Sequence, residues 1–287
     1  MKHNYNFIKA QNITWSFSLI LCCVAIISLI INGLNLSLEF TGGMQLEVRF
    51  QSPVTINYIT NKLEQAKFKS FKVQNYGSTK DFLIRLNSKN QNIIDCLSSV
   101  DNIAELRKTE YIGSEVGEKL LEQGIIAVII AILATMVYIA IRFESRLAIS
   151  AAITLLHNAL IVLGCFSIAK LEFDLATLAA VLAVIGYTLN DTIVIFDRVR
   201  ENFRKYHKET IKEIINISIN QTLSRTIMTS LLTLLVVLSL LFVGGKSLFG
   251  FALALTIGIL IGTYASIGVA GSIAVQIGLS RKDFLKR

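Results

Sequence analysis

Charged residues are scarce in this 287-residue chain, at 17% of the sequence, whereas an average soluble domain carries about 25%. Proline occurs once, at position 53, tryptophan occurs once, and no low-complexity segment is present. Hydrophobic residues make up 53% of the chain and lie in long blocks. This composition excludes an ordinary soluble domain and predicts a polytopic membrane protein.

Cysteine and histidine are too few and too scattered for most metal or catalytic sites. The four cysteines show no paired metal-ligand spacing, and the histidines at 3, 157 and 207 form no HExxH motif. No nucleophile–base motif appears, and GGKS at 244–247 lacks the first glycine of a phosphate loop, because position 240 is leucine. We therefore expect no catalytic residue, no metal site and no ordinary hydrolase or ATPase activity.

The net charge of +8 has two interpretations. A basic chain is typical of nucleic-acid binding, but lysine and arginine here flank the apolar blocks, where they orient membrane helices. They gather before the first apolar block, between the second and third, between the fourth and fifth, and after the last. This pattern predicts no nucleic-acid partner and places both termini in the cytoplasm.

Six apolar stretches, free of charge except for one residue in each of the fourth and fifth, are long enough to cross a bilayer. They lie at about 13–33, 124–141, 147–169, 175–196, 221–243 and within 247–280. The last contains Gly258-x-x-x-Gly262, a spacing typical of closely packed membrane helices. The chain therefore divides into three parts. Residues 1–34 contain the N-terminus and the first helix, residues 35–123 form a polar domain, and residues 124–287 contain helices two to six.

The segment 35–123 lies between the first two spans, which places it outside the cytoplasm. Its patterns predict strands and helices by their period of two or of about 3.6 residues. The expected strands are 44–50, 71–77, 81–87 and 104–113, and the expected helices are 55–68 and 91–100. This order is the split ferredoxin-like arrangement. The predicted fold is a six-helix membrane bundle plus an α+β ferredoxin-like extracytoplasmic domain.

A carboxylate interrupts the fourth span. Asp191 follows sixteen uncharged residues and precedes five more, before a charged cluster begins at Asp197. A charge at mid-membrane costs at least about 2.5–3.5 kcal/mol, so such a residue normally faces a bundle interior or a water-filled cavity. Arg225 in the fifth span lies at comparable depth if the two helices are antiparallel neighbours. Further polar lining would come from Asn190, His157, Thr226, Thr229, Ser230 and Thr233.

Two interpretations of Asp191 stay open. It forms a static ion pair that fixes helix register, or it relays protons with Arg225 as an electrostatic switch. Burial disfavours the charged carboxylate and a nearby guanidinium favours it, so a moving partner can load and unload a proton. Arginine does not itself release a proton. The membrane potential supplies about 2.3 kcal/mol per charge per 100 mV, enough to bias a two-state element.

Four motifs in one order resemble the SecF branch of the SecD/SecF family of protein-export membrane subunits. They are LSLEFTGGMQLEVRF at 36–50, YIAIRFESRLA at 138–148, VIGYTLNDTIVIFDRVREN at 184–202 and QTLSRTIMTSLLTL at 221–234. The resemblance runs from about 35 to 279. It implies a fold similar to the resistance–nodulation–division transporters, in the bacterial inner membrane.

The resemblance also implies a function. Such a subunit uses the proton motive force to complete translocation of unfolded preproteins after ATP-driven initiation, without enzymatic activity or a bound cofactor. Its implied partners are SecD, the channel subunits SecY, SecE and SecG, YajC, the preprotein and the lipid membrane. It assigns Asp191 and Arg225 to the proton pathway and a second carboxylate to SecD. Sodium stays an alternative ion, because a carboxylate serves either.

The chain departs from the family pattern at two places. The external motif usually reads D-F-x-G-G, whereas this chain has Glu39, Phe40, Gly42 and Gly43, in which the glycines allow a tight turn. Many relatives have His-Asp in the third span, where this chain has asparagine after His157.

Two other functions fit the sequence pattern less well. A stand-alone small-molecule exporter usually has twelve spans, and a structural assembly factor needs no charge in lipid.

Overall fold

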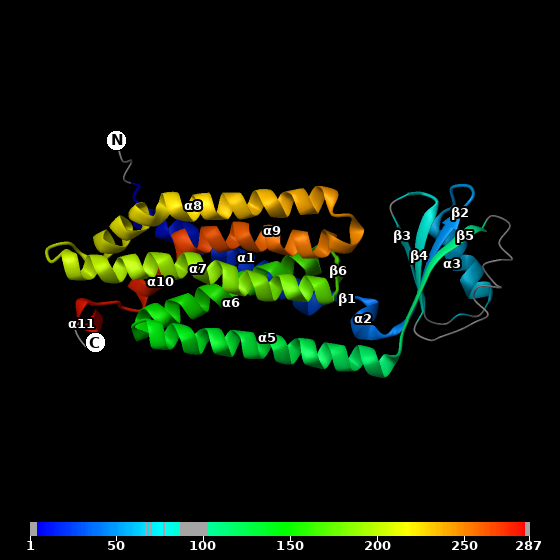
Figure 1. Ribbon diagram of the computed structural model, residues 1–287, viewed down its shortest axis with the longest axis horizontal. Coiled ribbons are helices and arrows are strands. Elements are labelled where there is room, and N and C mark those ends of the chain that lie inside the picture. Colours follow the sequence, from blue (N-terminus) through cyan, green and yellow to red (C-terminus); the bar gives the residue numbers. More distant parts are fainter. Residues whose placement is uncertain (1–4, 67, 69–70, 77, 87–102, 285–287) are drawn as a thin grey trace. The chain divides into compact units, whose positions relative to one another are not determined.

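A computed structural model describes residues 5–66, 68, 71–76, 78–86 and 103–284 (Figure 1). The chain forms two compact units. We call Met1–Asn35 with Ile126–Arg287 the membrane unit, and Leu36–Ile125 the α+β unit. The described residues contain six helices that are long and apolar enough to cross a membrane, which confirms the predicted six-span helical architecture.

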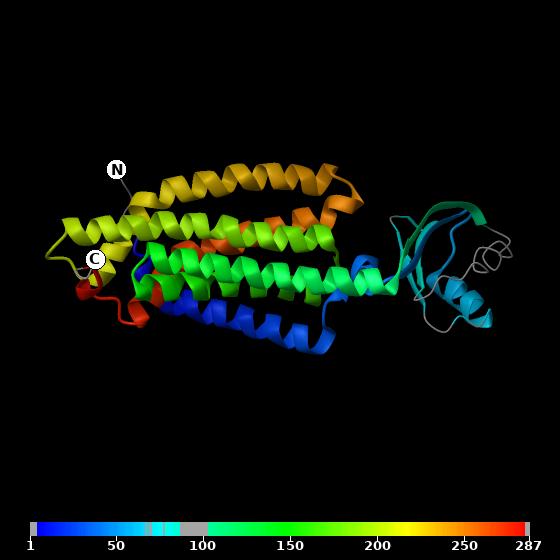
Figure 2. The same ribbon diagram turned by 60° about the horizontal axis from the view of Figure 1, so that its bottom comes forward.

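The six long helices run side by side in both views (Figure 2). The last one continues through a π-helical segment, Ser266–Ala270, into α10 (Gly271–Gln276), and a short α11 (Arg281–Phe284) follows. The long helices are α1 (Gln11–Asn32), α5 (Ser114–Arg142), α6 (Ser145–Ile168), α7 (Leu175–Lys205), α8 (Ile211–Val243) and α9 (Lys246–Ala265).

Three of these helices are longer than their uncharged stretches. Helix α5 begins before 124, α7 continues past 196, and α8 begins before 221. The added turns of α7 and α8 are held by packing, because Phe203, Ile214 and Ile215 are buried. A reciprocal capping box between Thr210 and Glu213 starts α8. Counting uncharged residues misses such amphipathic turns, since they carry charge on one side.

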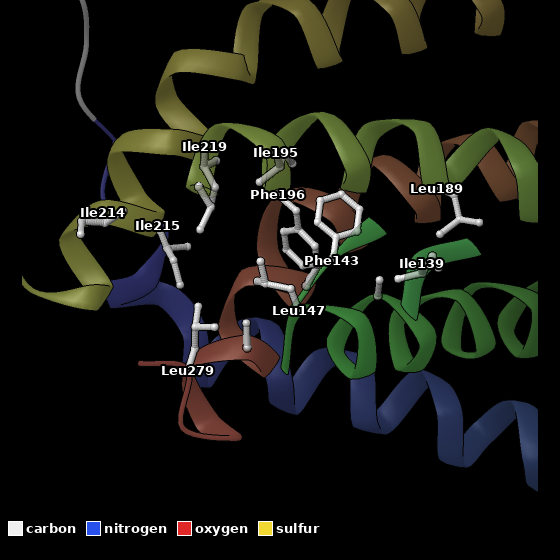
Figure 3. Packing of buried hydrophobic residues seen from close by; sticks show 14 of the residues in the cluster. Ile139, Phe143, Leu147, Leu189, Ile195, Phe196, Ile214, Ile215, Ile219 and Leu279 are labelled. Carbon is white, nitrogen blue, oxygen red and sulfur yellow. The ribbon is translucent and has the colours of Figure 1, made fainter. Parts of the chain in front are cut away.

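A large hydrophobic cluster lies at one end of the membrane unit. We call this end, where α5 and α7 finish and α6 and α8 begin, the basic end. Phe143 and Phe196 meet edge to face there, with ring centroids 5.9 Å apart, and Leu147 packs in the same cluster (Figure 3). The cluster therefore ties the end of α5 to the bundle.

The predicted close packing in the last span is confirmed. A Cβ atom added to Gly258 would lie 2.2 Å from a methyl of Val184, and one added to Gly262 would lie 2.0 Å from the methyl of Thr188. Both glycines therefore let α9 approach α7 closely, which brings the hydroxyl groups of the two helices within hydrogen-bonding reach.

The α+β unit contains one four-stranded sheet. Its strands lie in the order β3-β4-β2-β5, and every neighbouring pair is antiparallel. The elements are α2 (Leu38–Thr41), β2 (Gly43–Phe50), α3 (Ile56–Gln65), β3 (Phe71–Asn75), β4 (Asp81–Leu86) and β5 (Ile103–Ile112). Two short strands are not part of this sheet, namely β1 (Asn35–Leu36), at the boundary of the two units, and β6 (Glu172–Phe173), in the sequence of the membrane unit.

Alternation along β2 forms the core of the α+β unit. Leu46, Val48 and Phe50 are buried against Ile59 and Leu63 of α3, as the period of two in the strand and the helical spacing in α3 require. The four predicted strands and the first predicted helix are thereby confirmed. The second predicted helix, 91–100, lies outside the described residues.

Candidate functional site

Asp191 lies inside the membrane unit, where a chain of hydroxyl groups reaches it. Its side chain is on α7 and the residue is only 4% exposed. The Ser230 hydroxyl on α8 donates to Asp191 Oδ2 at 3.2 Å, and the Thr263 hydroxyl on α9 donates to Ser230 Oγ at 2.7 Å. Three helices therefore meet through one hydrogen-bonded chain that ends on the carboxylate.

A second pair of hydroxyl groups lies one residue from Asp191. Thr192 Oγ1 and Ser266 Oγ are 2.9 Å apart, and both residues are buried. Ser266 is the first residue of the π-helical segment that follows α9. Such segments are rare and often occur at functional sites. Asp191 and the next residue, Thr192, therefore both contact hydroxyl groups of other elements of the bundle.

Arg225 does not pair directly with Asp191. Among the described residues, no ion pair joins the two side chains within 4.0 Å. Arg225 is exposed on the surface of the membrane unit, and so is Asn190. A guanidinium at membrane depth is costly in contact with lipid, so this surface requires polar cover.

His157 and Thr226, also predicted for the site, are buried, whereas Thr229 and Thr233 are half-buried. Among the described residues, none of the four bonds to Asp191. His157 Nδ1 lies 3.0 Å from Asn158 Oδ1 in the same helix. Its Nε2 has no hydrogen-bond partner in the described part of the chain, and the same holds for the buried Thr226 hydroxyl. Both are unsatisfied polar groups within the bundle, where a water or a rearranged partner would be favourable.

Three contributors were missed from the sequence, namely Thr192, Thr263 and Ser266. The available signal was the position of Thr192 beside Asp191 and of the other two after Gly262, in the span with the close-packing motif. Hydroxyl residues are common in membrane helices, so this signal alone does not single them out. Within the residues that the structure describes, no group of three His, Cys, Asp or Glu side chains could hold a metal ion.

The external motif forms a turn inside the α+β unit. Gly42 and Gly43 have φ values of +65° and +119°, which side chains other than glycine rarely adopt. A Cβ on Gly43 would lie 2.3 Å from the Leu86 carbonyl oxygen. Phe40 is buried, and Glu39 is partly exposed. The glycines therefore have a structural reason, as predicted.

Comparison with protein families gives two matches on this chain. The family described as protein export membrane protein SecD/SecF, C-terminal, matches residues 92–280. The SecD/SecF GG motif matches residues 27–54, which include the turn at Gly42 and Gly43.

Individual proteins are similar over nearly the whole chain. The protein translocase subunit SecF of Pseudomonas aeruginosa is 41% identical over 286 residues, which cover 98% of this chain and 94% of that protein. The subunit of the same name from Escherichia coli O157:H7 is 38% identical over 295 residues, with 99% and 91% covered.

Solved structures show the same similarity. The crystal structure of SecDF, a translocon-associated membrane protein from Thermus thermophilus, matches with a TM-score of 0.88 at 34% identity. The match covers 96% of this chain but only 39% of that chain. A SecDF structure in a super-membrane-facing form matches with a TM-score of 0.74 at 33% identity, covering 98% of this chain and 40% of that one.

Proposed function

Since the chain belongs to the SecD/SecF family, we propose that it is a non-enzymatic translocase subunit that couples proton movement to the transport of unfolded proteins. The observation that carries this proposal is Asp191, a carboxylate 4% exposed in a six-helix bundle and hydrogen-bonded through Ser230 to Thr263. A group placed in this way can exist in two protonation states that require different contacts between helices.

The hydrogen-bonded chain gives the two states different geometry. When Asp191 is charged, Ser230 donates to it and Thr263 donates to Ser230. When Asp191 is protonated, its own O–H can donate and the Ser230 hydroxyl is free to turn to another acceptor. Proton binding therefore alters the link between α7, α8 and α9. The membrane potential contributes about 2.3 kcal/mol per charge per 100 mV toward that change.

The partner in this proposal is a SecD-like subunit that covers Arg225 and Asn190. Both lie exposed on the membrane unit, and an intramembrane charge needs a polar neighbour. The SecDF chain is much longer than this one, so it has room for a second bundle. A carboxylate of that bundle would share Arg225 with Asp191. The channel subunits SecY, SecE and SecG, and YajC, are further proposed partners.

We expect a photocrosslinking amino acid at Asn190 to capture the SecD-like subunit in native membranes. The matched position is Ile20, which is 61% exposed on α1, a helix that packs on α6 rather than on α8. Crosslinking at Ile20 is expected to yield lipid adducts. Equal capture of the subunit from both positions, or none from Asn190, would contradict the proposed partner surface.

The proposal extends to orientation and to the α+β unit. We propose that the basic end faces the cytoplasm with both termini, in agreement with the lysine and arginine pattern. The α+β unit would then lie outside, where an emerging polypeptide passes. Its antiparallel order β3-β4-β2-β5, with α3 between β2 and β3, supports a ferredoxin-like fold.

The proposed function is tested by export into inverted membrane vesicles, with and without this chain. Preprotein transport is started with ATP, and a protonophore is then added. In vesicles that contain the chain, we expect partly translocated intermediates to accumulate only after the protonophore is added. In vesicles that lack the chain, we expect these intermediates already before the protonophore is added, and we expect the protonophore to change nothing. Replacing sodium by choline in the same assay tests whether sodium, rather than the proton, is the coupling ion. Identical export by both vesicle types would contradict the proposal and favour a small-molecule exporter.

A further inference from the structure

The basic end of the membrane unit contains a cavity of about 610 Å³ between α5 and α7. Cationic side chains outnumber anionic ones in its lining, which consists of Arg142, Asp197, Arg200, Glu201, Arg204 and Lys205. The cavity lies outside the hydroxyl chain around Asp191. Its charge favours an anionic ligand.

The anionic side chains at this cavity already have partners. Arg142 pairs with Asp197 at 2.8 Å, and Glu201 pairs with Arg198. Arg200 lies 3.2 Å from Glu144, a buried carboxylate beside the cavity. These ion pairs use the carboxylates that the structure describes near the cavity, and they leave none of these carboxylates for the basic residues in the last turn of α7.

Arg204 and Lys205 supply that positive charge. Both are exposed, and neither forms an ion pair with any residue that the structure describes. Lys205 lies over the Tyr206 ring, 5.6 Å from its centroid, so its ammonium group stays near the cavity rim. Basic side chains beside a membrane-spanning segment attract anionic lipid headgroups.

The apolar surface of α5 leads away from the cavity. Near the basic end, Ile139 and Phe143 are each 1% exposed and attach α5 to the bundle. Ile130, Val137 and Ile141 are 60%, 58% and 71% exposed on the same helix. A ligand at the cavity would therefore have uncovered apolar surface beside it.

We propose that this cavity binds the phosphate of an anionic phospholipid, whose acyl chains lie against α5. Arg204 and Lys205 contact the phosphate. Arg142 and Arg200 line the cavity while they stay in their ion pairs with Asp197 and Glu144. Basic side chains in the last turn of a helix also offset its macrodipole. Offsetting the helix macrodipole needs neither the cavity nor a lipid, so the experiment has to distinguish this electrostatic role from lipid binding.

The test uses the full chain reconstituted in phosphatidylcholine vesicles with trace spin-labelled lipid. Electron paramagnetic resonance gives the ratio of association constants of phosphatidylglycerol and phosphatidylcholine from their immobilised fractions. A cation near an anionic headgroup contributes about 1 kcal/mol, or about fivefold in an equilibrium constant. We therefore expect the association constant of phosphatidylglycerol with the wild type to be at least about five times that of phosphatidylcholine.

The variant Arg204→Gln/Lys205→Gln is expected to lose this preference. The matched variant is Lys208→Gln/Lys212→Gln, which removes the same charge from exposed residues outside the cavity and is expected to keep it. Equal losses in both variants would show a general effect of surface charge and overturn the proposal. Displacement of the labelled lipid by millimolar glycerol phosphate would show a soluble-phosphate site and also overturn it.

Discussion

Gly43→Ala is expected to unfold the α+β unit while the membrane unit stays folded. Gly43 has a φ of +119°, and an added Cβ would lie 2.3 Å from the Leu86 carbonyl oxygen. That oxygen belongs to β4, whose pairing with β2 places Leu86 opposite Met44. Relief of the clash would require the central strand pair to separate.

The cost of this substitution combines two terms. A strained backbone conformation costs about 1–3 kcal/mol, and an overpacked site costs about 1–3 kcal/mol more. The sum is a large fraction of the stability of a small unit, which is on the order of 5–15 kcal/mol. Limited proteolysis with mass spectrometry measures the outcome, as rapid cleavage within 36–125 and protected membrane helices.

Gly33→Ala is the matched control for this prediction. Gly33 also has a positive φ, +65°, but a Cβ added there would have no atom within 4 Å. The substitution therefore adds backbone strain of about 1–3 kcal/mol without a clash. Gly33 also lies in the membrane unit, so we expect the α+β unit to resist proteolysis as in the wild type. Proteolysis of Gly43→Ala at the wild-type rate would show that the turn tolerates a side chain, contrary to this expectation.

The architecture of the membrane unit could be predicted from the sequence because bilayer thickness imposes a minimum apolar length. The ends of the helices could not, because packing decides them. Asn202 and Phe203 of α7, and Ile214 of α8, are buried beyond the apolar stretches. Charged neighbours hide these turns from any count of uncharged residues. In the α+β unit, strand periodicity was sufficient for β2 to β5.

The site was only partly predictable. Asp191 stood out because a carboxylate in an apolar helix is rare. Matching depths along α7 and α8 suggested Arg225 as its neighbour, but depth does not fix rotation. Ser230 comes five residues after Arg225, which is about 140° around a helix, and Ser230 is the residue that faces Asp191. Thr263 depended on how α9 packs and could not be assigned.

Asp191→Asn is expected to abolish the stage of export that depends on the proton motive force. The amide keeps the shape of the side chain and still accepts the hydrogen bond from Ser230, but it cannot take up a proton. At 100 mV, one coupled charge contributes about 2.3 kcal/mol, or about fiftyfold in an equilibrium. We therefore expect completion of export to fall by at least about tenfold, on the same scale.

Asp174→Asn is the control for this substitution. Asp174 caps the start of the same helix, and its Oδ1 accepts from the Thr177 backbone N–H at 2.7 Å. Asparagine caps helices as well as aspartate does, so assembly and export are expected to match the wild type. A comparable defect in this variant would mean that loss of any carboxylate on α7 impairs the protein.

In the proposed mechanism, Asp191 binds and releases the proton that drives export. The most direct measurement is export into inverted vesicles with and without a proton motive force, for the wild type, Asp191→Asn and Asp174→Asn, together with copurification of the SecD-like subunit. We expect Asp191→Asn to assemble and to start export with ATP but to gain nothing from the proton motive force. Stimulation of Asp191→Asn to the wild-type level would contradict the mechanism and make Asp191 a static structural residue.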